Sequence, residues 1–160
     1  MHQVKGMSTY LLALTCLLLI SAVSLKAKKQ GESSKQPTAA SSPAPLNYEF
    51  FKEKVEPIFV NRRPGRARCA TCHTTNNAAF HLVILPPGQA MWTEEESRKN
   101  FLLIKQVAYP GDLESPLLTH PLAEKAGGDF FHSGGKQFAS QDNPEWQTLK
   151  AFVLGATLNK

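Results

Sequence analysis

The sequence predicts a small all-α domain, and three observations support this class. Apolar side chains recur at helical spacing in three segments, 48–59, 94–108 and 144–156. Each segment follows a residue typical of helix N-caps, namely Asn47, Thr93, and Asn143 or Asp142. Finally, residues 69–73 read Cys-Ala-Thr-Cys-His, which indicates a bound cofactor. Such a group would supply apolar surface that so short a chain lacks.

The first predicted helix begins after Asn47. Its apolar face consists of Tyr48, Phe51, Val55 and Ile58, widened by Phe50 and Phe59. Pro57 lies near its last turn, and we expect this proline to end or kink the helix, because it lacks an amide hydrogen and its ring crowds the preceding turn.

The second predicted helix has the clearest start. Thr93 and Glu96 form a capping box, and an acidic first turn suits the positive end of the helix dipole. We expect this helix to run to about Ala108, to stop at Tyr109-Pro110-Gly111, and to bury Phe101, Leu102, Ile104 and Ala108.

Two further helices follow. Ser115-Pro116 predicts a short helix through Leu118 that Pro121 interrupts. In the last helix Pro144 takes the first position, and the buried stripe is Trp146, Leu149, Phe152, Val153 and Ala156.

Composition divides the chain into three segments. Residues 1–27 resemble an export signal, with Lys5 ahead of an apolar run, although the uncharged stretch 6–25 is also long enough for a membrane anchor. Cys16 lies inside that run and leaves with a cleaved signal. Residues 28–46 are rich in Ser, Pro, Ala and Lys and predict a disordered, flexible tether. The folded domain is therefore expected at residues 47–160.

The net charge of +5 gives no support to nucleic-acid binding. Residues 26–46 carry four lysines against Glu32, a net charge of +3, whereas residues 47–160 carry 13 Lys and Arg against 12 Asp and Glu. Four arginines precede the first cysteine of the motif: Arg62, Arg63, Arg66 and Arg68. Two interpretations of them remain, a solvated loop or a basic rim that pairs with haem propionates or an acidic partner.

Cys69, Cys72 and His73 form a C-x-x-C-H motif. One helical turn brings both thiols to the same face, where each can bond one vinyl group of a haem, and the adjacent imidazole can bind the iron. The same letters also fit a thioredoxin-like redox pair or half of a zinc site completed by two histidines. Together with an export signal, the motif favours one haem c attached in the periplasm or another exported location.

Several runs of the sequence resemble a known family, the class I c-type cytochromes, and more narrowly the planctomycete-type single-haem cytochrome c domains. The resemblance rests on the C-x-x-C-H motif after Val55-Glu56-Pro57-Ile58-Phe59, and on the runs 109–118, 131–135 and 146–155. It covers residues 47–155 and implies a cytochrome c-like fold around one covalently attached haem, with electron transfer as the activity.

A six-coordinate iron needs a second axial ligand besides His73, and four residues are candidates: His81, Met91, His120 and His132. We favour His132, because small residues follow it and allow the backbone to approach a porphyrin closely, and because its loop resembles the family's distal motif. His120, flanked by apolar residues, comes next. Met91 would give the His/Met pairing, but the ligand methionine of many class I cytochromes comes from a late loop, and here none follows residue 91.

His81 is only eight residues from His73, which leaves little chain to round a haem edge. A backbone carbonyl is expected to accept the Nδ1–H of His73. The resemblance to class I cytochromes implies that a proline downstream provides it, and Pro86 or Pro87 is suitably placed.

The expected function is electron transfer by an exported carrier, free or tethered to a membrane by its N-terminal segment, that exchanges electrons with redox partner proteins and needs no catalytic side chain. The alternative is a small haem peroxidase or a gas-binding sensor, in which the sixth iron ligand is displaceable.

Overall fold

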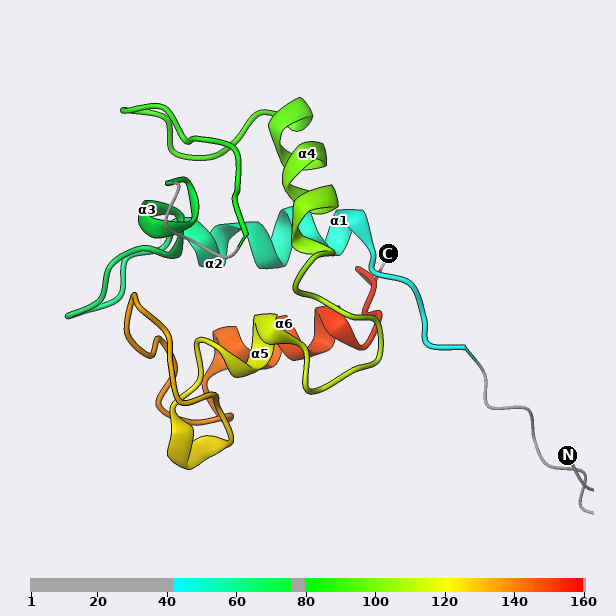
Figure 1. Ribbon diagram of the computed structural model, residues 1–160. Helices are drawn as coiled ribbons and strands as arrows, with labels where there is room; N and C mark the ends of the chain where they lie inside the picture. Colours follow the sequence, from blue (N-terminus) through cyan, green and yellow to red (C-terminus); the bar gives the residue numbers. More distant parts are fainter. Residues whose placement is uncertain (1–41, 76–79, 160) are drawn as a thin grey trace, which may run out of the picture. The chain divides into compact units, whose positions relative to one another are not determined.

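The computed structural model describes residues 42–75 and 80–159, and within these ranges the backbone forms helices and no strand (Figure 1). Residues 40–160 make up one compact unit. The described part is therefore helical, as an all-α domain requires. The predicted signal or anchor at residues 1–27 and most of the predicted tether lie outside the described residues. None of the helices in the described ranges is long and apolar enough to cross a membrane.

The first helical segment runs without a break from Tyr48 to Val60, but its hydrogen-bond pattern changes along the way. α1 (Tyr48–Phe50) leads into a π-helical turn (Phe51–Val55), which leads into α2 (Glu56–Val60). Asn47 caps the start, because its Oδ1 accepts the amide of Phe50 at 2.8 Å.

Pro57 does not end this helix. The amide of Glu56 donates to the carbonyl of Phe51, which closes a wider π-helical turn directly before the proline. Since Pro57 has no amide hydrogen and its ring crowds the preceding turn, this wider turn gives it room, and α2 continues to Val60.

α4 (Glu94–Ile104) begins with the predicted capping box. It ends at Ile104 and not at Ala108, yet Val107 and Ala108 are still buried, because both amides donate to the carbonyl of Ile104, at 3.0 and 2.9 Å. The expected burial of Leu102 is wrong: 63% of this residue is exposed.

α5 (Pro116–Thr119) and α6 (Pro144–Val153) form where they were predicted, with Asn143 as the cap of α6. The α6 stripe is buried except for Ala156, which lies beyond the end of the helix. The indole of Trp146 donates to the carbonyl of Leu118 at 3.1 Å and so ties α6 to α5. On the other side, the rings of Phe152 and Phe51 lie 5.8 Å apart and join α6 to the π-helical turn.

The last residues of the predicted tether pack against the domain. Leu46 lies against the hydrophobic core. A Cβ added at Gly111 would lie 2.7 Å from the Cβ of Pro43, and one added at Gly155 would lie 2.5 Å from that of Ala44. Both glycines also have positive φ, 75° and 82°. A side chain at either position would therefore be disfavoured by the backbone conformation as well as by the contact.

Candidate cofactor site

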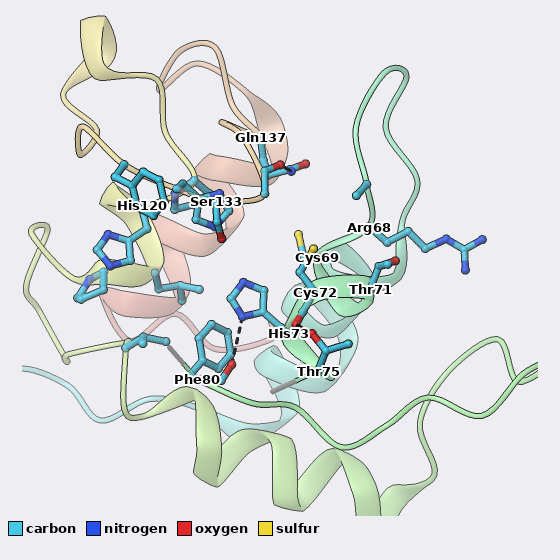
Figure 2. A pocket seen from close by; sticks show the side chains of 18 residues that line it. Arg68, Cys69, Thr71, Cys72, His73, Thr75, Phe80, His120, Ser133 and Gln137 are labelled. Carbon is cyan, nitrogen blue, oxygen red and sulfur yellow. Dashed lines mark hydrogen bonds between the residues drawn. The ribbon is translucent and has the colours of Figure 1, made fainter. Parts of the chain in front are cut away.

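α3 (Cys69–His73) is a single helical turn that carries the whole C-x-x-C-H motif. Both cysteines are free thiols and are partly buried. Figure 2 shows their sulfur atoms next to each other above the ring of His73. Burial raises the pKa of the Cys69 thiol, against the opposing effect of Arg63, so this group is protonated at neutral pH. The helical turn therefore presents two thiols and one imidazole to the same space.

That space is a cavity of about 510 Å³, within the range of small-molecule and cofactor sites. α3, α5 and the loop 131–137 contribute to its walls. Much of the lining is apolar and comes from segments far apart in the sequence: Phe80, Val107, Pro116, Leu117, Pro121 and Phe131.

His73 is held from its Nδ1 side. This nitrogen lies 3.2 Å from the carbonyl oxygen of Phe80, and the ring stacks on the Phe80 ring with centroids 4.3 Å apart (Figure 2). Nδ1–H therefore donates to the carbonyl and Nε2 remains for a metal. Burial lowers the pKa of His73, while the Phe80 carbonyl opposes this effect. The ring is thus neutral at neutral pH, which is the metal-binding form.

The expectation of a proline carbonyl behind His73 is wrong. The acceptor comes from Phe80 and not from Pro86 or Pro87, because the chain passes α3 again at this point: the amide of Leu82 donates to the carbonyl of His73 at 2.6 Å. No local signal in the sequence marks this contact.

His132 faces His73 from the glycine-rich loop. The two ring centroids are 6.2 Å apart and the ring planes differ by 26°. The Nδ1 of His132 lies 2.8 Å from the carbonyl oxygen of Gly135, so Nε2 is free here too. Two imidazoles on opposite sides of one metal have centroids about 6 Å apart, since each metal–nitrogen bond is about 2 Å and each nitrogen lies about 1 Å from its ring centroid. The observed spacing fits that arrangement.

Gly134 adjoins both the loop histidine and a cysteine. A Cβ added here would lie 3.5 Å from Cε1 of His132 and 3.9 Å from Sγ of Cys72. A larger side chain at this position would take up space between them, so the glycine keeps this part of the cavity open.

The other ligand candidates divide into two groups. His120 lines the cavity, and its Nδ1 contacts the carboxylate of Asp129. His81 is exposed and Met91 is partly buried, and neither lines the cavity. Among the described residues, no group of three or more His, Cys, Asp or Glu side chains is arranged to hold a metal ion.

The four arginines before the motif do not share one role, and Arg63 fits neither interpretation made from the sequence. Arg63 has a structural position: its Nε contacts Glu145 at 2.5 Å, its Nη2 donates to the carbonyl of Ile58 at 3.2 Å, and the guanidinium lies 5.0 Å from the centroid of the Phe138 ring. The remaining three arginines are exposed, and of these Arg68 lines the cavity.

Sequence reasoning missed several residues of the site. Phe80 orients His73, Asp129 contacts His120, and Phe131 lines the cavity although 71% of it is exposed. Of these residues, only Phe131 could have been suspected from the sequence, because two adjacent phenylalanines, Phe130 and Phe131, stand in a glycine-rich stretch.

Comparison of the chain with protein-family models, with curated proteins and with solved structures finds no match.

Proposed function

We propose that the chain is an exported electron carrier with one haem c, attached through Cys69 and Cys72 and ligated by His73 and His132. One observation carries the proposal: two imidazoles face each other across a largely apolar cavity, and a backbone carbonyl holds the Nδ1 of each. Both Nε2 atoms are then available to one iron, in the tautomer that binding requires.

The cysteines suit covalent attachment. Both are free thiols on the cavity wall, one helical turn apart. Each thiol can add across a vinyl double bond, so that sulfur bonds one carbon and hydrogen the other, and neither oxidant nor leaving group is involved. The bound group supplies one-electron chemistry by cycling its iron between the ferric and ferrous states.

The protein's part in electron transfer is to keep the site rigid and dry. The Phe80 carbonyl fixes the orientation of His73, and the Gly135 carbonyl fixes that of His132. Fixed ligands in both oxidation states keep the reorganisation on electron transfer small. The apolar side chains of the cavity wall exclude water from the iron, and no acid or base is needed.

The resemblance to class I c-type cytochromes of the planctomycete single-haem type supports this function. The proposed location is the periplasm or another exported site, with the N-terminal segment either cleaved or kept as a membrane tether. The proposed partners are redox proteins. The alternative function, a haem peroxidase or gas-binding sensor, requires His132 to leave the iron readily.

Absorption spectra of the purified, oxidised and reduced protein test the proposal. We expect a Soret band that survives denaturation and acid-acetone extraction, because the haem is covalently bound, and the sharp visible bands of a low-spin iron in the reduced form. A colourless protein with the mass of the bare polypeptide, made in a host that matures cytochromes c, would overturn the proposal and favour the zinc or dithiol interpretations. Rapid and complete binding of carbon monoxide to the reduced protein would favour the alternative function.

The variant His132→Ala tests the distal ligand. We expect it to keep the attached haem but to become high-spin or water-ligated, since the variant lacks the second imidazole. His81→Ala is the matched control, because this histidine is exposed and outside the cavity lining, and it should keep the low-spin spectrum. If His132→Ala has the same low-spin spectrum as the parent, His132 is not a ligand of the iron.

A further inference from the structure

A polar cluster lies at the end of the cavity away from the cysteines. Figure 2 shows His120 across the cavity from Cys69 and Cys72. The Nδ1 of His120 contacts the Oδ2 of Asp129, and the hydroxyl of Thr119 donates to the same oxygen at 3.3 Å. These contacts involve neither the two proposed iron ligands nor the cysteines, so the proposed haem attachment does not account for them.

Lys136 completes this cluster. Its ammonium group donates to the carbonyl of His120 at 3.1 Å and also to the carbonyl of Asp129. The lysine therefore bridges the two backbone segments that carry the imidazole and the carboxylate, and it adds a positive charge beside them.

The backbone around the cluster is closely packed. The amide of Asp129 donates to the carbonyl of Thr119 at 3.1 Å, which closes the loop between them. A Cβ added at Gly128 would lie 2.0 Å from the carbonyl oxygen of Leu122, so only glycine fits here. Main-chain contacts therefore hold Asp129 next to His120.

We infer that the Nε2 of His120, oriented by Asp129, binds a carboxylate of the cofactor, that is, a haem propionate. The inference rests on the proposed function. In a haem the two vinyl groups and the two propionates occupy opposite edges of the macrocycle. Since the cysteines take the vinyl edge, the propionates belong at the end of the cavity where His120 lies.

This contact requires a proton. The Nδ1–H of His120 donates to Asp129, so in the neutral ring Nε2 has only a lone pair. The propionate carboxylate is also an acceptor, so it can form a hydrogen bond with Nε2 of His120 only when one proton lies between them. The histidine and the propionate therefore form one titrating unit.

Four charged or titratable groups surround His120. Lys136 and the two facing histidines, His73 and His132, disfavour its protonation, and Asp129 favours it. Burial together with His132 and Lys136 lowers the pKa of His120 in the empty cavity. A carboxylate at Nε2 acts with Asp129 in the opposite direction, because both negative charges favour the protonated imidazole.

Proton and electron uptake are then coupled. Reduction removes one positive charge from the iron, which makes protonation of the nearby unit easier. The reduction potential of the protein should consequently fall as pH rises through the range in which the unit loses its proton.

The test measures the reduction potential of the holoprotein by spectroelectrochemistry from about pH 5 to about pH 9. We expect the parent potential to fall across this range and His120→Gln to lose most of that fall. In Asp129→Asn the fall should move to lower pH, because the carboxylate that favours protonation is gone. His81→Gln, exposed and outside the cavity lining, is the control and should follow the parent.

A second measurement detects the propionate directly. With haem labelled by carbon-13 at its carboxyl groups, the infrared carboxylate bands should shift in His120→Gln and remain in place in His81→Gln. Unchanged bands together with an unchanged pH dependence in His120→Gln would overturn the inference.

The spectra separate the two possible failures. If His120→Gln is coloured and low-spin but titrates like the parent, this inference fails and the proposed function stands. If His120→Gln becomes high-spin, His120 is an axial ligand, which also overturns the inference. If the parent itself carries no haem, the proposed function fails.

Discussion

Glu56 is a carboxyl group placed in the core, with 1% of the residue exposed. The hydroxyl of Ser97 on α4 donates to its Oε2 at 2.8 Å, whereas its Oε1 has no hydrogen-bond partner among the described residues. Burial is the largest influence and raises the pKa of Glu56, although Ser97 and Asn100 oppose it. The protonated form is therefore the one that the fold favours.

Glu56→Gln tests this effect of burial. Between the ordinary pKa of a glutamate and the raised one, the folded state binds more protons than the unfolded state, so the free energy of unfolding falls as pH rises. Urea denaturation at about pH 5 and about pH 8 should show this loss in the parent and a smaller loss in Glu56→Gln. Glu53→Gln, an exposed change in the same helical segment, should behave like the parent. Equal losses in the parent and Glu56→Gln would contradict the assignment.

Arg63 is the second residue whose role is decided by its contacts. It joins the loop before α3 to Glu145 on α6 and to the carbonyl of Ile58 on α2, and it is largely buried. We expect Arg63→Ala to lower the free energy of unfolding by about 2 kcal/mol, since it leaves a partly buried carboxylate and a carbonyl without their donor. Arg62→Ala, exposed in the same loop, should change it by less than about 0.5 kcal/mol. Equal effects of the two variants would show that the contacts of Arg63 contribute nothing specific.

At the level of elements, the start of α4 depends on a reciprocal cap. Glu96 Oε2 accepts the amide of Thr93 at 2.8 Å, and Thr93 Oγ1 accepts the amide of Glu96 at 3.4 Å. Thr93→Ala should therefore lower the free energy of unfolding by about 1 kcal/mol, measured by chemical denaturation. Thr93→Ser keeps the hydroxyl and should stay close to the parent, so a serine variant as unstable as the alanine variant would argue against the cap.

Helix starts were predictable from the sequence because caps are local. Asn47, Thr93 and Asn143 each bond amides two or three residues further on, and the sequence shows such pairs directly. The π-helical turn was not predictable, since Pro57 signals a disturbance but not whether the chain ends, kinks or widens a turn. The exposure of Leu102 depends on which face of α4 is covered, which is a tertiary property.

The candidate site follows the same division. Cys69, Cys72 and His73 could be grouped from the sequence because they are contiguous in one helical turn. His132 was preferred for the small residues after it and for its resemblance to a family motif, and in the structure it lies opposite His73. The carbonyl of Phe80 could not be predicted, because its place beside His73 depends on a contact with α3 further along the chain, where the amide of Leu82 donates to the carbonyl of His73.

At the scale of the whole domain, the cavity lies between elements that do not pack directly against each other. It separates α3 from α5 and the loop 131–137, whereas Phe51 and Phe152 pack directly against each other. If haem occupies the cavity as proposed, the haem-free full chain should be less stable by at least about 2 kcal/mol, because a ligand that binds only the folded state stabilises it. Thermal unfolding of the protein made with and without cytochrome maturation measures this difference.

Hydrogen exchange locates the same effect. In the haem-free chain, amides of α3 and of the loop 131–137 should exchange much faster than in the holoprotein, while those of α6 stay protected. Equal stability and equal exchange in the two forms would mean that the cavity does not depend on its occupant.

Pro43 and Ala44, which lie against Gly111 and Gly155, also fix where the described chain begins on the domain. In Figure 1 this point is near the C-terminus, at the far end of the first helical segment from α3. If the proposed haem occupies the cavity and the first residues hold the protein at a membrane, the attachment point lies far from α3, and the exposed Phe131 on the cavity wall stays accessible to a redox partner in solution.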